Sequence, residues 1–151
     1  MDLNLKAALY KSCVSFLEKR LNVIQHRLNE LNDSLEAETK SSVGDKYETG
    51  RAMLHLEKDK QMRQLAVLLD YKKQLHRINP EIECDCVEQG ALVETNQGVF
   101  YLSISAGKLT VEGNSYFAIT LASPIGQLLF QKKVGEELEF RGRRYSIKNI
   151  I

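Results

Sequence analysis

The first third of the chain carries one repeating pattern of apolar residues. From Leu3 to Leu35, apolar side chains recur at alternating steps of four and three, and most positions between them are polar. The stripe consists of Leu3, Ala7, Tyr10, Val14, Leu17, Leu21, Ile24, Leu28, Leu31 and Leu35. This spacing predicts a helix with a coiled-coil seam. About 33 residues at a rise of ~1.5 Å per residue span roughly 50 Å, so we expect this helix to project from a small domain.

A second long helix is predicted from about Asp45 to Ile78. The intervening segment 36–44, EAETKSSVG, combines Ser and Thr residues with a Gly, which ends a helix and permits a chain reversal. The second apolar stripe is less regular and runs through Leu54, Met62, Leu65, Leu68 or Leu69, and Leu75. The heptad pattern alone is also compatible with a parallel dimer. The break and the second amphipathic helix favour an antiparallel hairpin within one chain.

The sequence changes character at Asn79-Pro80. Pro80 ends the second helix, because the residue before a proline avoids the α region. Short runs rich in Val, Ile, Tyr, Phe and Thr follow, separated by Gly and Asn. Strands are predicted at 91–94, 99–104, 108–112, 116–120, 137–140 and 145–150, and a short helix at 125–130 with Ser123 as N-cap and Pro124 at its first position.

These patterns predict an α+β protein with two domains. Residues 1–78 form a long antiparallel helical hairpin with coiled-coil packing and an acidic tip at 36–48. Residues 79–84 form a linker. Residues 85–151 form a small α+β domain, which can fold if its sheet packs on its one helix.

Composition narrows the class of protein. Hydrophobic residues make up 43% and charged residues 27% of the chain, and the net charge is +1. This balance excludes a nucleic-acid binder that works through a strongly basic whole surface. The chain has no apolar run long enough to span a membrane, its first residues do not resemble a signal peptide, and its three cysteines do not suggest a secreted disulfide scaffold. We therefore expect a cytoplasmic monomer without membrane contact.

The hairpin tip is rich in carboxylates. Glu36, Glu38, Asp45 and Glu48 lie there, and Asp45 and Glu48 are three residues apart, which places them on one face of a helix start. Two such carboxylates can hold Mg²⁺, which prefers hard oxygen ligands. The same spacing fits a capping box, in which an acid at the N-cap faces an acid at the third helical position. The spacing is compatible with both interpretations.

Other chemistry-bearing residues give weaker signals. Cys84-Asp85-Cys86 has too short a spacing for a zinc knuckle, and a second pair is absent from the sequence. The three histidines, His26, His55 and His76, stand singly on predicted helices. The sequence contains no glycine-rich phosphate loop and no nucleophile elbow. These observations do not support an enzyme that acts alone.

Three segments resemble one known family, the bacterial transcript-cleavage factors GreA and GreB. The segment from Ser123 to Glu139, SPIGQLLFQKKVGEELE, is similar to the SPIARALLGKKVGDEVEV type of segment in the FKBP-like C-terminal domain of that family. Gly90-Ala91-Leu92-Val93 resembles the opening strand of the same domain, and Gly44-Asp45-Lys46-Tyr47-Glu48 resembles the GDLKEN motif of the family's hairpin tip.

The resemblance implies a function. The hairpin of a Gre factor enters the secondary channel of bacterial RNA polymerase, and the polymerase then hydrolyses backtracked RNA. By resemblance, Asp45 and Glu48 would be assisting tip acids that hold a Mg²⁺ shared with the polymerase, with no cofactor bound tightly to the free protein. The nascent RNA would be reached only indirectly. The residues expected to contact the polymerase from the FKBP-like domain are Ser123, Pro124, Ile125, Lys132 and Lys133.

The segment after Glu48 departs from the family pattern. The family commonly continues with Asn-Ala-Glu-Tyr, whereas this chain continues with Thr49-Gly50-Arg51-Ala52, so Arg51 replaces an acid. An alternative is therefore a Gre-fold regulator or inhibitor that binds polymerase without stimulating cleavage. A third possibility from another class is a coiled-coil interaction protein.

Overall fold

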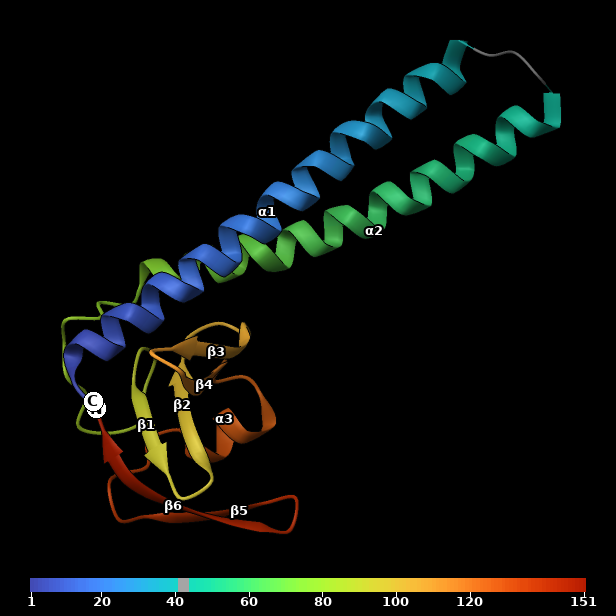
Figure 1. Cartoon of the computed structure of the whole chain (residues 1–151). Coiled ribbons are helices and arrows are strands. Elements are labelled where there is room, and N and C mark those ends of the chain that lie inside the picture. Colours follow the sequence, from blue (N-terminus) through green and yellow to red (C-terminus); the bar gives the residue numbers. More distant parts are fainter. Residues whose placement is uncertain (41–43) are drawn as a thin grey trace. The chain divides into compact units, whose positions relative to one another are not determined.

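The chain is an α+β protein in which two long helices precede a six-stranded sheet. The computed structural model describes residues 1–40 and 44–151, with side chains described outside residues 39–47. Helix α1 spans Leu3–Lys40 and helix α2 spans Gly44–His76 (Figure 1). The chain divides into two compact units, and both helices contribute to each of them. One unit is Leu17–Tyr71, and the other joins Met1–Phe16 to Lys72–Ile151.

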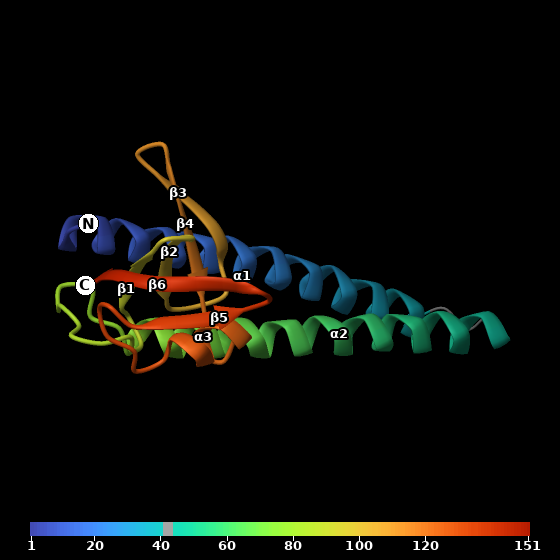
Figure 2. The same cartoon turned by 90° about the horizontal axis from the view of Figure 1, so that it is seen from below.

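In the unit Leu17–Tyr71, α1 and α2 lie side by side and run antiparallel (Figures 1 and 2). A Cβ atom on Gly50, near the start of α2, would lie 3.4 Å from Oε1 of Glu38, near the end of α1. The residues buried in this unit are Leu17, Ile24, Leu28 and Leu35 of α1 and Gln61 and Leu68 of α2. The buried residues of α1 all belong to the stripe that the sequence predicts.

The helix ends differ from the sequence prediction. α1 continues past Leu35 to Lys40, because Glu36, Ala37 and Glu38 are all compatible with a helix interior. The predicted break at 36–44 is therefore too wide. α2 ends at His76, two residues before the predicted end at Ile78.

The buried row of α2 also differs from the predicted stripe. Met62 is 48% exposed and Leu69 is exposed as well, whereas Gln61 is only 1% exposed. Leu54, Gln61, Leu68 and Leu75 follow one another at exact heptad steps, so Gln61 occupies a place in the row between two leucines. Because the sequence prediction considers only apolar residues, it places the neighbouring Met62 in the stripe instead of Gln61.

The second unit contains all six predicted strands, with ends that differ from the prediction by at most two residues. They are β1 (Leu92–Thr95), β2 (Gly98–Leu102), β3 (Gly107–Val111), β4 (Asn114–Ile119), β5 (Glu137–Phe140) and β6 (Arg143–Ile150). The strand order is β3-β4-β2-β1-β6-β5, and every pair is antiparallel except β2 and β4. Two-residue turns at Glu112-Gly113 and Arg141-Gly142 have positive φ at both positions, which suits the twist of a tight hairpin.

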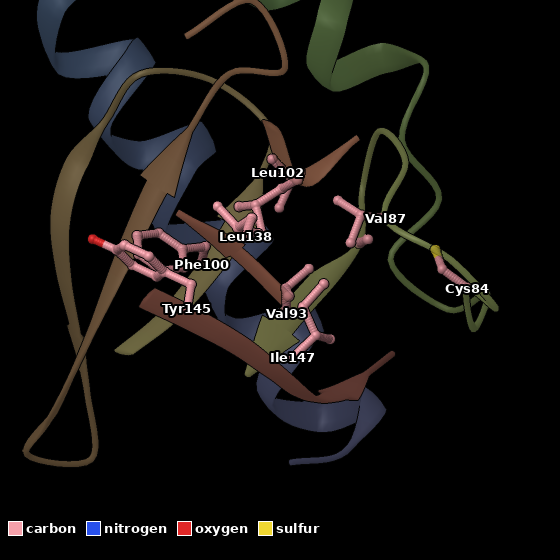
Figure 3. Packing of buried hydrophobic residues seen from close by; sticks show 10 residues of the cluster. Cys84, Val87, Val93, Phe100, Leu102, Leu138, Tyr145 and Ile147 are labelled. Carbon is pink, nitrogen blue, oxygen red and sulfur yellow. The ribbon is translucent and has the colours of Figure 1, made fainter. Parts of the chain in front are cut away.

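Helix α3 spans Pro124–Leu129 and follows the predicted N-cap Ser123, with Pro124 at the first position. It contributes Leu129 to a hydrophobic core that lies on one face of the sheet (Figure 3). The core is made of Cys84, Val87, Ala91, Val93, Phe100, Leu102, Leu129, Leu138, Tyr145 and Ile147. Gly126 is required in α3, because a Cβ atom there would lie 2.1 Å from the carbonyl oxygen of Thr120.

The opposite face of the sheet is covered by the first turns of α1. Tyr101 alternates along β2 with the core residues Phe100 and Leu102, so its side chain points to this second face. Sγ of Cys13 on α1 lies 3.5 Å from Oγ of Ser103, and Leu9 and Cys13 are both fully buried. These contacts explain why Met1–Phe16 belongs to the sheet unit, whereas the sequence pattern assigns residues 1–78 to a hairpin domain.

Candidate functional site

The acidic end of the hairpin presents Glu48 to solvent. Glu48 lies in the second turn of α2 and is exposed. Asp45 is part of the same helix, but its side chain lies outside the described residues, so its predicted roles as metal ligand and as cap stay predictions. Because the two residues are three apart within one helix, they share a face. An exposed carboxylate such as that of Glu48 is a hard oxygen donor and suits Mg²⁺.

A third acid reaches this end of the hairpin from the other helix. Glu38 is half-buried, and its carboxylate packs over Gly50, where a Cβ atom would be 3.4 Å from Oε1. The next residue, Arg51, is also half-buried. Gly50 and Arg51 belong to the segment 49–52, in which all four residues depart from the Gre pattern, and an acid from α1 packs against Gly50. The sequence places Glu38 at the tip but gives no sign of this contact.

The segment at α3 contains residues with clear structural roles. Oγ of Ser123 accepts a hydrogen bond from the backbone N–H of Gly126 at 3.1 Å and donates one to the carbonyl of Thr120 at 2.7 Å. Ile125 is half-buried against the core. Ser123 and Ile125, two of the five expected partner-binding residues, are therefore engaged in the fold of their own unit. Pro124 and Lys133 are exposed, and Lys132 is half-buried.

Exposed apolar side chains follow in the same segment. Leu128, Phe130 and Val134 are 41%, 46% and 55% exposed. We call Pro124, Leu128, Phe130, Lys133 and Val134 the α3 surface. Exposed apolar side chains, with an aromatic residue among them, are common on protein-binding surfaces. The sequence contains these residues, but only the fold shows that they are left outside the core.

A buried polar cluster lies between α1 and the sheet, within the second unit. Lys6 is 0% exposed, and its Nζ donates to the carbonyl of Ile82 at 2.6 Å, to the carbonyl of Ile151 at 3.0 Å and to Sγ of Cys84 at 3.5 Å. The hydroxyl of Tyr101 is buried and has no hydrogen-bond partner among the residues that the structure describes. A lysine on an amphipathic helix is normally expected in solvent, so the sequence gives no signal for this cluster.

Burial controls the ionisation of this cluster. Burial raises the pKa of the Cys84 thiol, the ammonium of Lys6 lowers it, and Glu88 raises it. Burial also raises the pKa values of Cys13 and Tyr101, and the hydrogen bond from Ser103 opposes the effect at Cys13. The thiols and the phenol are therefore held in their neutral forms.

The described part of the chain has neither a cluster of three metal-ligating side chains nor a membrane-spanning helix. Among the side chains of residues 1–38 and 48–151, no three His, Cys, Asp or Glu residues are grouped so that they could hold a metal ion. Within residues 1–40 and 44–151, no helix has the length and apolar character needed to cross a membrane.

Comparison with known proteins gives no match. No protein-family model matches the chain, and neither the curated proteins nor the solved structures include a significant match.

Proposed function

We propose that this protein is a Gre-like factor that binds bacterial RNA polymerase, inserts its helical hairpin into the secondary channel and stimulates cleavage of backtracked RNA. The observation that carries this proposal is the antiparallel pairing of α1 and α2. It brings the end of α1, with Glu38, to the start of α2, with Glu48, at one end of the hairpin. Within this proposal the hairpin is a coiled coil and the sheet unit has an FKBP-like fold.

The carboxylates at this end would assist the polymerase rather than form a complete active site. Asp45 and Glu48 would hold a Mg²⁺ together with ligands of the polymerase. Bound there, the ion would activate a water molecule and stabilise developing negative charge at the phosphate. The chain's own contribution is to present acids on a narrow pair of helices. Two carboxylates leave most of the coordination shell of Mg²⁺ to water and the partner, so the free protein would bind the ion weakly.

A cleavage assay on stalled bacterial polymerase tests this function. Asp45→Asn and Glu48→Gln should abolish stimulated cleavage and leave polymerase binding largely intact, because an amide keeps the size of the side chain but loses its charge. Glu36→Gln is the matched control, since Glu36 is an exposed acid of α1 outside the proposed pair. If Asp45 serves only as a cap, Asp45→Asn should have almost no effect, because Asn caps a helix about as well as Asp.

The α3 surface would dock the sheet unit on the polymerase. Leu128, Phe130 and Val134 offer apolar area, and Lys133 offers a charge beside it. Val134→Asp should weaken the binding of the full chain to polymerase, because it places a charge in the apolar contact. Ile82→Asp is the matched control, since Ile82 is 59% exposed and lies outside this surface. Equal binding by both variants and the wild type would contradict a docking role for the α3 surface.

A second candidate is a regulator that occupies the channel without stimulating cleavage. The position of Arg51 favours it, because a half-buried cation follows Gly50 at the acidic end of the hairpin. Wild-type protein that binds polymerase but never stimulates cleavage, at any Mg²⁺ concentration, would support this candidate. Arg51→Glu should then produce cleavage activity if the cation is what prevents it.

A further inference from the structure

Lys6 is an unusual residue for a protein interior. Its side chain is fully buried, and its ammonium group meets two backbone carbonyls and one thiol. In the part of the chain that the structure describes, no Asp or Glu side chain forms an ion pair with it. Buried lysines normally have a charged partner, because removing an ammonium group from water is costly. The three acceptors satisfy its hydrogen bonds. An apolar side chain would nevertheless fill the same space without the free-energy cost of removing a charge from water.

The thiol of Cys84 is the reactive group nearest to this amine. Nζ of Lys6 and Sγ of Cys84 lie 3.5 Å apart, and the two residues are 78 positions apart in the sequence. Cys84 belongs to the segment between α2 and β1, and its side chain lies at the margin of the hydrophobic core (Figure 3). The carbonyls of Ile82 and Ile151 hold the lysine nitrogen in place from two further directions. The nitrogen and sulfur atoms are therefore held facing each other by the fold.

The other two cysteines lack this arrangement. Cys13 is buried and its Sγ lies 3.5 Å from the hydroxyl of Ser103, which is not a nucleophile under mild conditions. Cys86 is half-buried, and among the described residues its sulfur forms no hydrogen bond with a lysine, unlike that of Cys84. Cys84 is thus the cysteine for which the structure supplies a second reacting group.

We propose that Lys6 and Cys84 form an oxidative cross-link in which one oxygen atom joins the lysine nitrogen to the cysteine sulfur. The oxidant is a peroxide. One equivalent of hydrogen peroxide converts the thiol to a sulfenic acid and releases water. The ammonium group of Lys6 first releases a proton to solvent, and the resulting free amine reacts with the sulfenic acid and a second peroxide, whose O–O bond breaks. This step forms the N–O bond and releases two further waters.

The atoms and electrons of this reaction balance. The thiol, the amine and two hydrogen peroxide molecules give the S–O–N bridge and three waters. Sulfur and nitrogen each lose two electrons, and the two peroxides take up four. The distance of 3.5 Å favours this product over a direct S–N bond, because an inserted oxygen spans more of the gap and demands less movement of the buried backbone.

Solvent can reach the edge of this site. An open polar depression with a volume of about 540 Å³ is lined by Met1, Asp2, Leu3, Asn4, Glu83, Asn149, Ile150 and Ile151. Glu83 precedes Cys84 in the chain, and the carbonyl of Ile151 accepts a hydrogen bond from Lys6. The depression is therefore lined by residues that flank both reacting groups, and we propose it as the entry route for hydrogen peroxide. Burial favours the neutral thiol, so the reaction is expected to be slow.

Mass spectrometry of the full-length protein after peroxide treatment tests the proposal. The expected product gains one oxygen and loses two hydrogens, and its proteolytic map joins the peptide containing Lys6 to the peptide containing Cys84. Dithiothreitol should restore the original mass, because the bridge contains a reducible sulfur. The cross-linked protein should also melt at a higher temperature than the reduced one, since the bridge ties α1 to a segment distant in sequence.

Variants identify the two atoms. Lys6→Arg and Cys84→Ser should lose the product, whereas Cys86→Ser and Cys13→Ser should keep it. Wild-type protein treated in urea should not form it, because the fold holds the two groups together. Since the wild-type peptide map already identifies the linked residues, the test does not depend on the folding of the Lys6 variant.

Three results would overturn the proposal. One is a sulfinic acid on Cys84 with Lys6 unmodified. Another is a product that has lost two hydrogens without gaining oxygen, as in a Cys84–Cys86 disulfide or a direct S–N bond. The third is the absence of any Lys6 adduct in folded protein after the thiols have been oxidised.

Discussion

Three buried polar side chains, which have lost their hydrogen bonds to water, differ in how many hydrogen-bond partners the protein gives them. Lys6 gives its ammonium hydrogens to three acceptors. Gln61 donates from Nε2 to Oε1 of Glu57 at 2.8 Å, but its own Oε1 has no partner among the described residues. The hydroxyl of Tyr101 likewise has none within that part of the chain. A buried polar atom without a partner lowers the free energy of unfolding by about 1–3 kcal/mol, so Gln61 and Tyr101 both reduce the stability of the protein.

Replacing Tyr101 by Phe should not destabilise the protein. Tyr101→Phe removes a buried hydroxyl that lacks a partner, so the free energy of unfolding should stay the same or rise by about 1 kcal/mol. Chemical denaturation measures the change. Tyr10→Phe is the control, because the hydroxyl of Tyr10 donates to the carbonyl of Leu75 at 3.1 Å, and its loss should cost about 0.5–1.5 kcal/mol. A clear loss of stability in Tyr101→Phe would mean that its hydroxyl has a partner.

Two glycines should respond in opposite ways to the same substitution. In Gly126→Ala the new Cβ would lie 2.1 Å from the carbonyl oxygen of Thr120, and we expect a loss of about 1–3 kcal/mol or more. In Gly50→Ala the closest atom is a carboxylate oxygen of Glu38 at 3.4 Å. That is an acceptable contact, so the better helix propensity of Ala should raise stability by up to about 1 kcal/mol. Thermal melts of both variants check this contrast, and equal shifts would contradict it.

At the scale of the elements, the two helices differ in how they fill their shared seam. The buried residues of α1 within the unit Leu17–Tyr71 are a regular apolar row, whereas α2 places Gln61 between Leu54 and Leu68. A polar residue in such a row lowers stability and specifies which positions face each other. Gln61, with its unpaired Oε1, therefore lowers the stability of this packing.

Replacing Gln61 by Leu should strengthen the hairpin. Gln61→Leu removes the unpaired Oε1 and adds buried apolar area, so unfolding should require about 1–3 kcal/mol more. Met62→Leu is the control, because Met62 is exposed and its replacement should change little. Leu28→Ala should act in the opposite direction and cost about 2–5 kcal/mol, since Leu28 is buried. An unchanged stability of Gln61→Leu, measured by urea denaturation, would place the side chain in contact with water.

Local sequence signals predicted the elements well and their assembly less well. The heptad stripe, Ser123-Pro124 and the glycine turns each act within a few residues, so the helices, the strands and the cap of α3 follow from them. The burial of Lys6 and Gln61 depends on chain segments that are distant in the sequence, so the local sequence pattern around each residue does not predict it. For the candidate site, the sequence indicated Glu48 and the α3 segment, but the contact of Glu38 with Gly50 required the pairing of two helices.

At the scale of the whole molecule, the two compact units are built on different amounts of buried surface. The sheet unit is packed on both faces, by α3 on one side and by the start of α1 on the other. The unit Leu17–Tyr71 consists of two helices that share a single buried seam. Regions with fewer buried apolar contacts open more easily, so the units should differ in local stability.

Native-state hydrogen exchange should reveal this difference. Backbone amides of β1, β2 and β6 should exchange more slowly than amides in the part of the helices between Leu17 and Tyr71. The Gln61→Leu variant is a useful comparison, because it should slow exchange within the helices and leave the strands unchanged. Similar protection in both units of the wild-type protein would show that they open together as one cooperative body.

The contact between Lys6 and Ile151 has a consequence for synthesis of the protein on the ribosome. Lys6 and Ile151, whose carbonyl accepts a hydrogen bond from the Lys6 ammonium group, are 145 positions apart in the sequence, so the donor is synthesised long before the acceptor and strand β6. The apolar face of α1 around Leu9 and Cys13 therefore stays exposed until the strands that cover it have been translated. The nascent protein thus exposes a hydrophobic helix segment during the synthesis of the residues between α1 and the sheet, and we expect ribosome-associated chaperones to bind it there.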